Sequence, residues 1–294
     1  MNNKNQLYYL DTHSNNNEYD NILVLIHGNL ISNKYWTRLI NLIQQQNSKI
    51  RCISMDLRGF GQSQINNHVE HITDLSNDVD NLLNQLLSDK NEEEYYQKHV
   101  YLAGWSLGGI VSMQLAVDYP NKYQRLILIA SGSVCGYALM AEDGIGQVRC
   151  QTKQQVKEHP KVALQQQKLN DKDKNFMRII FDKLLFNSGK YPEEQEYQQL
   201  LDETFLQTQY TDVCWALNQF DISSGGTNKA SSIKGPVLIY HGEIDLVIPY
   251  IQAQGNAKEI GEEKCTVIIR PGIGHMPPIE DDTNLAQEIS RFIN

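Results

Sequence analysis

Short, mostly apolar runs recur along this chain, and polar or turn-forming residues separate them. The six clearest are residues 22–26, 50–55, 100–103, 126–130, 237–240 and 266–269. Strands that are apolar on both faces are typical of a sheet that is covered on both sides. Between these runs lie segments with helical periodicity, of which residues 72–87 are the clearest. The alternation predicts an α/β fold, with a mainly parallel, twisted sheet and helices on both faces.

The alternation stops between residues 136 and 232, where the sequence becomes rich in Gln, Lys and Glu. Helical periodicity covers residues 156–169, 176–186, 193–209 and 212–220, and we find no convincing strand there. The simplest interpretation divides the chain into a first part of the core (1–135), an inserted helical cap (136–232) and a second part of the core (233–294). Open α/β sheets bind ligands at the carboxyl ends of their strands, so the cap is expected to roof a pocket there.

The net charge of −9 and the pI of about 5.4 come from acidic residues spread along the chain. Without a basic stripe, nucleic acid is not an expected partner. Hydrophobic residues make up 40% of the chain, but no apolar run approaches the roughly 20 residues that span a bilayer. The first twenty residues are polar and Asn-rich, unlike a secretory signal or a transit peptide. We therefore expect a globular protein without a membrane span.

The five cysteines are odd in number and far apart: Cys52, Cys135, Cys150, Cys214 and Cys265. This spacing favours neither a disulfide framework nor a zinc site and indicates a reducing, cytoplasmic compartment, although organellar placement stays open. No cluster of His, Cys, Asp or Glu has the spacing of metal ligands. We expect no metal and no cofactor.

The sequence Gly104-Trp105-Ser106-Leu107-Gly108 lies between an apolar run and a helical segment. Glycines two places before and after the serine relieve the crowding of a sharp strand-to-helix turn. A Gly-x-Ser-x-Gly pattern alone is weak, because such pentapeptides also occur in ordinary loops. Its position between a strand and a helix favours a nucleophilic Ser106 exposed at the end of the strand.

A serine nucleophile needs a base and a carboxylate that orients the base. His275 follows the last apolar run through a loop rich in turn formers, and Asp245 follows the run before it. Taken alone, each has a plainer interpretation, as an exposed loop histidine or a turn residue. Glu243 competes with Asp245 for the role of the carboxylate, but it lies nearer the end of the strand and is expected to have a supporting role. The order Ser106, Asp245, His275 matches the order in α/β-hydrolases.

Acyl transfer also requires two donors for the oxyanion. We expect them to be the backbone amides of Leu107, at the start of the helix, and of Asn29, in the loop after the first apolar run. Within that loop, Gly28 allows close approach and His27 is expected to anchor the backbone. Residues 56–63, Asp-Leu-Arg-Gly-Phe-Gly-Gln-Ser, lack the full pattern of a nucleotide-binding loop and are interpreted as a rigid structural loop.

Five separate segments together resemble the α/β-hydrolase superfamily, in the group with a helical cap. They are residues 27–29, 56–63, 104–109, 242–249 and 274–275, and the likeness extends over essentially the whole chain. Ser106 stands where the haloalkane dehalogenase and epoxide hydrolase branches use aspartate. Residues 27–29 with Ser32 and Trp36, the Gly-Trp-Ser sequence and cap residues 212–218 are similar to bacterial intracellular short-chain-length polyhydroxyalkanoate depolymerases, which hydrolyse esters of 3-hydroxybutyrate.

The residues and the resemblance together predict a serine hydrolase that cleaves a small-molecule carboxylic ester or lactone through an acyl-enzyme. We expect Trp105, Trp215 and Met276 to line the substrate pocket. Other reactions of the fold would keep the same residues, among them carbon–carbon bond hydrolysis, peptide cleavage and perhydrolysis. An alternative of another class is a non-catalytic receptor or assembly subunit. The sequence sets no oligomeric state.

Overall fold

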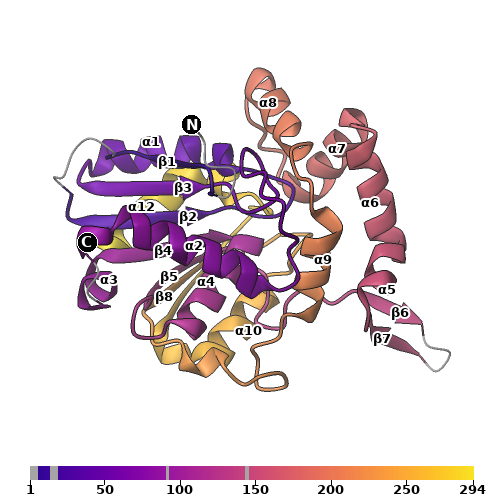
Figure 1. Ribbon diagram of the computed structural model, residues 1–294. Helices are drawn as coiled ribbons and strands as arrows, with labels where there is room; N and C mark the ends of the chain where they lie inside the picture. The colour runs from indigo at the N-terminus through magenta and orange to yellow at the C-terminus, as the bar shows by residue number, and fades with distance from the viewer. Residues whose placement is uncertain (1–5, 14–18, 91–92, 143–145) are drawn as a thin grey trace.

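The computed structural model describes residues 6–13, 19–90, 93–142 and 146–294, and in this part of the chain a seven-stranded sheet runs in the order β1-β3-β2-β4-β5-β8-β9 (Figure 1). β1 pairs antiparallel to β3, and all other neighbours are parallel. The strands are β1 Tyr9–Asp11, β2 Asn21–Ile26, β3 Ile50–Met55, β4 Val100–Trp105, β5 Arg125–Ile129, β8 Val237–Gly242 and β9 Cys265–Arg270. The predicted α/β fold is confirmed.

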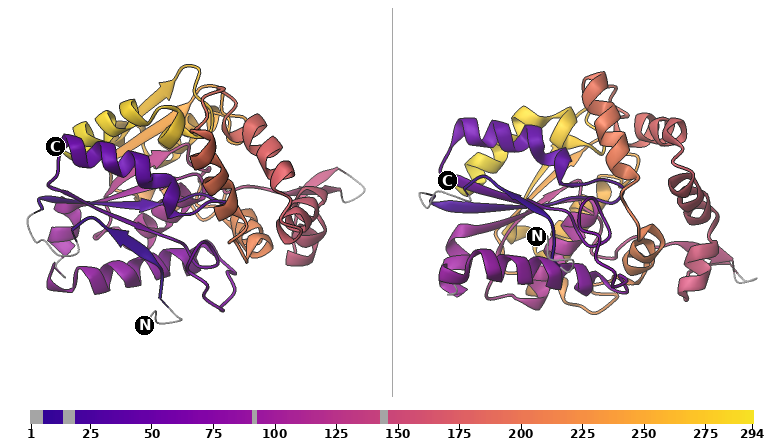
Figure 2. Two further views of the ribbon diagram at one scale, coloured as in Figure 1. Left: turned by 90° about the horizontal axis from the view of Figure 1, so that it is seen from above. Right: turned by 45° about the horizontal axis from the view of Figure 1, so that its top comes forward.

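Helices cover both faces of the sheet because successive strand residues point to opposite sides. In β2, Ile22, Val24 and Ile26 contribute to one apolar cluster, whereas Leu23 and Leu25 contribute to the other. In Figure 2 the indigo α1 and the yellow α12 lie on one side of the sheet, and the purple α2 lies on the other. The core helices are α1 Thr37–Gln46, α2 Ile72–Leu86, α3 Glu93–His99, α4 Leu107–Asp118, α10 Ile251–Ile260, α11 Pro277–Glu280 and α12 Asp282–Ile293.

The insertion lies between β5 and β8, two strands that pair directly in the sheet. Its helices lie to one side of the core in Figure 1. They are α5 Lys153–Glu158, α6 Pro160–Asn170, α7 Lys174–Ile180 with a following π-helical turn Phe181–Leu185, α8 Glu194–Thr204 and α9 Tyr210–Gln219. The limits 136 and 232 for the cap stay a prediction. Ile222, Ala230 and Ile233 belong to one apolar cluster with core residues and with Val213 and Ala216 of the cap helix α9.

Three short strands were not predicted from the sequence. β1 is three residues long and lies at the edge of the sheet, where little apolar surface is required. β6 Met140–Glu142 and β7 Gln147–Arg149 form an antiparallel pair within the insertion, which corrects the expectation of an insertion without strands. Met140 and Val148 are 41% and 37% exposed. A pair of strands that buries so little has no periodic apolar signal.

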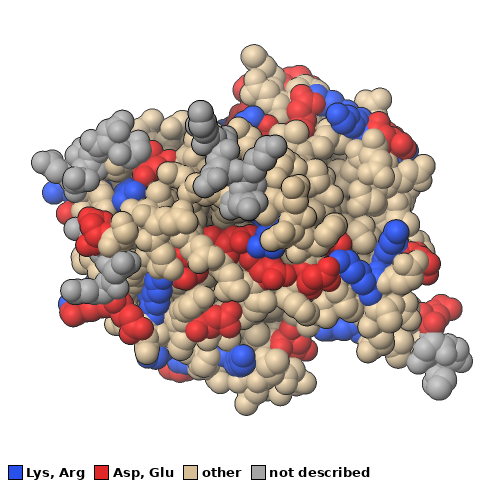
Figure 3. Space-filling view, in the orientation of Figure 1, with Lys and Arg blue, Asp and Glu red and all other residues tan. Residues whose placement is uncertain are grey.

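The insertion is fastened to the core by charged and polar contacts. Lys153 pairs with Glu70 at 2.7 Å and with Asp212 at 2.8 Å. Glu203, which is nearly buried, accepts hydrogen bonds from Ser32 and from the ammonium of Lys34. On the face of the molecule in Figure 3, acidic side chains gather in a band across the middle. The contacts of Lys153 and Glu203 with the core fix where the insertion lies relative to the carboxyl ends of the strands.

Candidate active site

Ser106 occupies a sharp turn between Trp105, the last residue of β4, and Leu107, the first residue of α4. Its backbone has φ 56° and ψ −114°, a conformation that residues other than glycine rarely adopt. The Ser106 N–H donates to the Ile129 carbonyl at 3.1 Å, and the Gly132 N–H donates to the Ser106 carbonyl at 3.1 Å. These bonds hold Ser106 in a strained conformation at the carboxyl end of the strand.

Backbone groups pack so closely around this turn that two positions require glycine. A Cβ atom on Gly104 would lie 2.1 Å from the Gly108 carbonyl oxygen, and one on Gly108 would lie 2.0 Å from the Ile26 carbonyl oxygen. Ile26 is the last residue of β2, the strand beside β4. The glycines therefore let the first turn of α4 lie directly against the end of the neighbouring strand.

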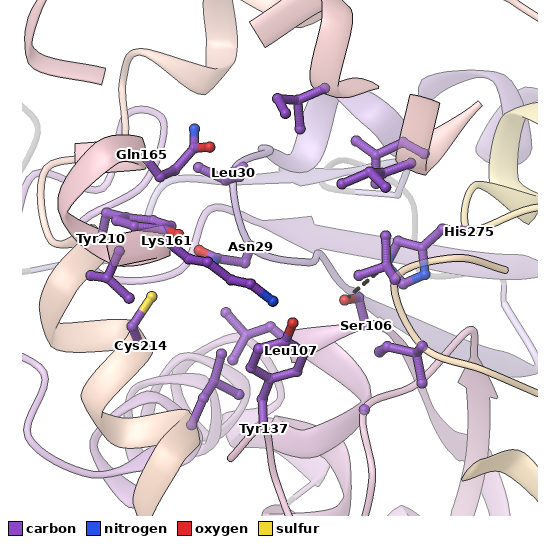
Figure 4. Close-up of a pocket in the computed structure, with 18 of the residues that line it drawn as sticks. Asn29, Leu30, Ser106, Leu107, Tyr137, Lys161, Gln165, Tyr210, Cys214 and His275 are labelled. Carbon is purple, nitrogen blue, oxygen red and sulfur yellow. Dashed lines mark hydrogen bonds between the residues drawn. The ribbon is translucent and has the colours of Figure 1, made fainter. Parts of the chain in front are cut away.

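The structure brings Ser106, His275 and Asp245 together from three separate loops. The Ser106 hydroxyl lies 3.1 Å from His275 Nε2, drawn as a dashed line in Figure 4, and His275 Nδ1 lies 2.7 Å from Asp245 Oδ2. With the proton on Nδ1 donated to the carboxylate, Nε2 is free to accept from the hydroxyl. Glu243 lies elsewhere: it is exposed, and its carboxylate accepts from the Gly272 N–H at 3.3 Å.

The Asp245 carboxylate is buried and fully surrounded by donors. Its Oδ1 accepts the N–H groups of Val247 and Ile248, both at 2.8 Å, and Oδ2 also lies 3.2 Å from His241 Nε2. Burial alone would raise the pKa of Asp245, but the charge of His275 and the hydrogen bonds from the two histidines outweigh it and hold the pKa below its usual value. Asp245 is therefore an anion at neutral pH.

His241 was not singled out from the sequence. It is the fifth residue of β8, and its ring is completely buried. Its Nε2 also lies 2.8 Å from the Ile248 carbonyl oxygen, so the ring bridges the strand and the loop that carries Asp245. A histidine four residues before an aspartate is the one local signal for this contact, and many surface helices and loops share it.

The loop after β2 lies beside Ser106. A Cβ atom on Gly28 would be 3.1 Å from the Ser106 Cβ, and both Asn29 and Leu107 line the space in front of Ser106. Leu107 begins α4, and the N–H groups of a first helical turn have no acceptor within the helix. The two predicted oxyanion donors therefore belong to segments that meet at the serine.

Gln207, in the segment between α8 and α9, ties the Asn29 loop to the insertion. Its side-chain oxygen accepts the Leu30 N–H at 3.0 Å, and its amide nitrogen donates to Asn29 Oδ1 at 2.8 Å. Leu30 has φ 65°, so the loop is held in a conformation that needs support. The sequence analysis missed Gln207, because its partners lie 177 and 178 positions away.

A cavity of about 500 Å³ lies in front of Ser106, between the core loops and the insertion. Its lining is mostly aliphatic and aromatic, with Val162, Phe176 and Phe181 from the cap among the residues that form it. The polar side chains that line it include Asn29, Tyr137, Lys161, Gln165 and Tyr210, as Figure 4 shows. A serine with a paired imidazole thus forms part of the wall of a largely apolar pocket.

Comparison with known proteins identifies the family and the fold of this chain. The sequence profile of the Hydrolase_4 family, described as serine aminopeptidase, S33, matches residues 17–282. The chain belongs to the Hydrolase_4 family. Its architecture is the α/β-hydrolase fold, and solved structures of that fold superimpose on almost its whole length.

Two solved structures and one curated relative illustrate the likeness. A bromoperoxidase from Bacillus anthracis superimposes with a TM-score of 0.71 at 20% identity, and an esterase from Exiguobacterium antarcticum with 0.70 at 19%; each covers 98% of this chain and 95% of the other. Over 109 residues this Hydrolase_4 chain is 38% identical to the pimeloyl-(acyl-carrier protein) methyl ester esterase of Shewanella oneidensis. That match covers 37% of this chain and 34% of the relative, so it spans about a third of the relative's length.

Two of the predicted pocket residues, Trp105 and Met276, lie behind the site in this Hydrolase_4 protein. The ring centroids of Trp105 and Trp36 lie 6.2 Å apart, and the Trp105 Nε1–H donates to the His275 carbonyl at 2.9 Å. Strand alternation explains this placement, because Trp105 shares its face of β4 with Ala103, inside the core. Met276 is completely buried, and its N–H donates to Glu280 at 3.0 Å. Both support the loop of His275 and neither lines the cavity, which corrects the expectation.

Trp215, the third predicted pocket residue, lies on α9. Tyr210 and Cys214 line the cavity, and they are four residues apart on one face of that helix. Trp215 is the next residue and is rotated about 100° from Cys214, so it packs half-buried against an apolar cluster and does not line the cavity. The helix was predicted correctly, but not the face that it presents to the pocket.

His27 and residues 56–63 have the structural roles that the sequence predicted. His27 Nδ1 donates to the Gly28 carbonyl at 2.7 Å, and Nε2 accepts the Leu57 N–H at 2.9 Å. Burial lowers the pKa of His27 to about 4, which keeps the ring neutral. Asp56 accepts the N–H groups of Asn33 and Gln62, both at 2.8 Å, and burial raises its pKa to about 6. The hydrogen bonds of His27 and Asp56 stabilise the loop that carries Asn29.

The five cysteines are free. Among the described residues no three His, Cys, Asp or Glu side chains gather in a way that could hold a metal ion. No helix in the described part of the chain is long and apolar enough to cross a bilayer. The compartment predicted from the cysteines stays a prediction.

The close approach at Gly108 gives a first testable prediction. We expect Gly108→Ala to lower the free energy of unfolding by about 1–3 kcal/mol or more, because the added methyl group meets the Ile26 carbonyl. Urea unfolding followed by circular dichroism measures the change. Gly255→Ala in α10 is the matched control: a Cβ atom there meets nothing within 4 Å, so this variant should gain up to about 1 kcal/mol of helix propensity. Equal stabilities of Gly108→Ala and the parent would contradict the packing argument.

The lowered pKa of Asp245 gives a second prediction, for Asp245→Asn. Near pH 4 the unfolded chain binds a proton at this carboxylate more readily than the folded chain, so the pair stabilises the fold above the unfolded pKa of about 3.9. We expect the parent to be the more stable protein at pH 6. Its advantage over Asp245→Asn should shrink as the pH falls below about 4, in thermal unfolding measured across this range. An advantage that does not vary with pH would refute the assignment.

Proposed function

We propose that this chain is a serine hydrolase that cleaves a carboxylic ester or lactone through an acyl-enzyme. The observation that carries the proposal is the chain of contacts from hydroxyl to imidazole to carboxylate, at 3.1 and 2.7 Å, in the wall of an apolar cavity. Ser106 attacks the carbonyl carbon while His275 Nε2 accepts its proton. Asp245 orients the ring and stabilises the imidazolium that forms.

The negative charge that develops on the carbonyl oxygen is stabilised by the backbone amides of Asn29 and Leu107. The intermediate then collapses, and His275 donates its proton to the departing alcohol. Water, losing a proton to His275, attacks the acyl-enzyme and releases the acid and the free Ser106 hydroxyl. These steps require no metal or cofactor. The positions of Asn29 and Leu107 beside Ser106 support their role as donors.

The substrate that fits the cavity is an ester or lactone with a small to medium acyl group. A volume of about 500 Å³ and a largely apolar lining support this size and character. The Shewanella oneidensis relative is named as a methyl ester esterase, which supports ester hydrolysis as the reaction. Within that class we propose esters of the 3-hydroxybutyrate type, on the resemblance to the polyhydroxyalkanoate depolymerases. Short p-nitrophenyl esters and 3-hydroxybutyrate oligomers are the first substrates to compare.

The family description names an aminopeptidase, and the charge of the cavity argues against that reaction here. An aminopeptidase must bind the free α-ammonium group of its substrate, for which a carboxylate is the natural partner. Among the described residues that line the cavity there is no Asp or Glu, and Lys161 is present. A second ammonium would be repelled, which favours neutral or anionic esters as substrates.

A fluorophosphonate probe tests the nucleophile directly. We expect the probe to label the native chain at Ser106 and to leave Ser106→Ala unlabelled, and hydrolysis of short p-nitrophenyl esters should be lost in the same variant. Intact-mass spectrometry measures the labelling. Ser112→Ala is the matched control, because Ser112 lies farther along α4 with its hydroxyl bonded to the Gly108 carbonyl at 2.9 Å. Equal labelling of native chain and Ser106→Ala would reject Ser106 as nucleophile, and absence of labelling in a folded native chain would favour a non-catalytic receptor or subunit.

Gln207 is the residue through which the insertion positions the Asn29 loop. We expect Gln207→Leu to lower kcat for p-nitrophenyl esters by about tenfold with a smaller change in KM, because the two lost hydrogen bonds hold a donor that acts in the transition state. Steady-state kinetics measure both constants. Gln198→Leu serves as the control, since the Gln198 side chain donates to Glu194 of the same helix α8 and does not line the cavity. A rise in KM with unchanged kcat would show that Gln207 contributes to binding alone.

A further inference from the structure

Lys161 extends from the cap into the cavity. It is the second residue of α6, and it belongs to the lining of the cavity in front of Ser106. In Figure 4 its nitrogen points across the cavity towards the side on which Ser106 lies. Lysines on a cap usually direct their ammonium groups to bulk water or to a carboxylate of the protein, so this direction calls for a partner within the cavity.

No carboxylate of the described chain neutralises this ammonium. Three other cap lysines have such a partner: Lys153 pairs with Asp212, Lys168 with Asp173 at 2.8 Å and Lys174 with Asp202 at 2.6 Å. What distinguishes Lys161 from the remaining cap lysines is that it lines the cavity. Within the described residues Lys161 makes no ion pair or hydrogen bond, and the lining of the cavity includes no Asp or Glu. The charge of Lys161, which solvent also reaches, is therefore available to a ligand in the cavity.

Tyr137 provides a second polar group in the same space. Its ring lies opposite Lys161 in Figure 4, with the hydroxyl directed into the cavity. Ile180 and Leu217 are among the apolar side chains that line the same cavity, while Lys161 and Tyr137 are themselves exposed, Tyr137 by 45%. A single carboxylate can accept from an ammonium and a phenol together. One ammonium balances one negative charge, which fits a carboxylate better than a doubly charged phosphate.

The charge of the chain as a whole has the opposite sign. The net charge of the chain is −9, and acidic side chains form the band across the face shown in Figure 3. An anionic substrate is thus repelled by much of the molecule and attracted inside the cavity. Binding of an anionic substrate by this protein therefore depends on a positive charge inside the cavity, which Lys161 provides.

We propose that Lys161 is a specificity-determining residue that binds a carboxylate carried by the substrate away from the ester that is cleaved. The inference rests on the proposed ester hydrolysis at Ser106 and names the substrate class: monoesters of dicarboxylic acids, or esters of acids with a free terminal carboxylate. The aliphatic stretch between the two groups lies along the apolar lining. Tyr137 donates a second hydrogen bond to the carboxylate.

Two series of esters test the proposal. One contains mono-p-nitrophenyl esters of linear dicarboxylic acids of increasing length, and the other contains the same esters with the terminal carboxylate replaced by a primary amide of equal size. We compare kcat/KM of the native chain, Lys161→Met, Lys161→Arg and Lys157→Met. Lys157 is an exposed cap lysine on α5 that does not line the cavity, so Lys157→Met is the matched control.

We expect the native chain to prefer the carboxylate ester by about tenfold in kcat/KM at the best length, equivalent to about 1.4 kcal/mol. The preference should weaken with added salt, because an ammonium that solvent reaches is screened. Lys161→Met should lose the preference, because its kcat/KM for the carboxylate ester falls to that for the amide ester. Lys161→Arg and Lys157→Met should both retain the preference.

The same measurements separate this inference from the proposed function. If Lys161→Met keeps the preference, or if the native chain hydrolyses the amide ester as fast as the carboxylate ester, the role of Lys161 is overturned while ester hydrolysis stands. If neither series is hydrolysed and the fluorophosphonate probe fails to label Ser106, the proposed function fails and the role of Lys161 fails with it.

Discussion

The contact between the first turn of α4 and the end of β2 is the constraint on which the rest of the site depends. Because Gly108 has no side chain, the helix reaches the Ile26 carbonyl, and the turn that precedes it closes around Ser106. The strained backbone of Ser106, the start of α4 at Leu107 and the nearness of Gly28 are all found beside this contact. Neighbouring parallel strands supply the rigidity that keeps a strained residue in place.

The buried Asp245 shows how the sheet supports the chemistry. An ion held away from water is unfavourable unless donors surround it, and here two backbone N–H groups and two histidines do so. His241 belongs to the strand and His275 to a loop, so the carboxylate joins a rigid element to the residue that we propose accepts and donates protons. Glu280 has a similar function behind His275, since it accepts the N–H groups of Gly274 and Met276.

Sequence alone predicted those features that a local pattern specifies. Mostly apolar runs predicted six strands of the sheet, and glycines around Ser106 predicted the turn, because both depend on constraints within a few residues. The direction in which a side chain points was harder to predict from the sequence. Trp105 and Met276 adjoin Ser106 and His275 in the chain, yet each points into the core behind them. Gln207 and Lys161 had no signal at all, since their importance comes from where the cap folds back over loops that are distant in sequence.

The attachment of the insertion also limits how a substrate can reach Ser106. The segment that carries Glu203 and Gln207 is bonded to the loop of residues 29–34, whereas α6 packs on α5 and α9, and α7 packs on α8. Lifting the whole insertion would release Asn29 and leave the centre unfit for reaction. Displacing only α6 and α7 would open a passage and keep those bonds intact. The contacts of Glu203 and Gln207 with residues 29–34 therefore do not depend on the positions of α6 and α7.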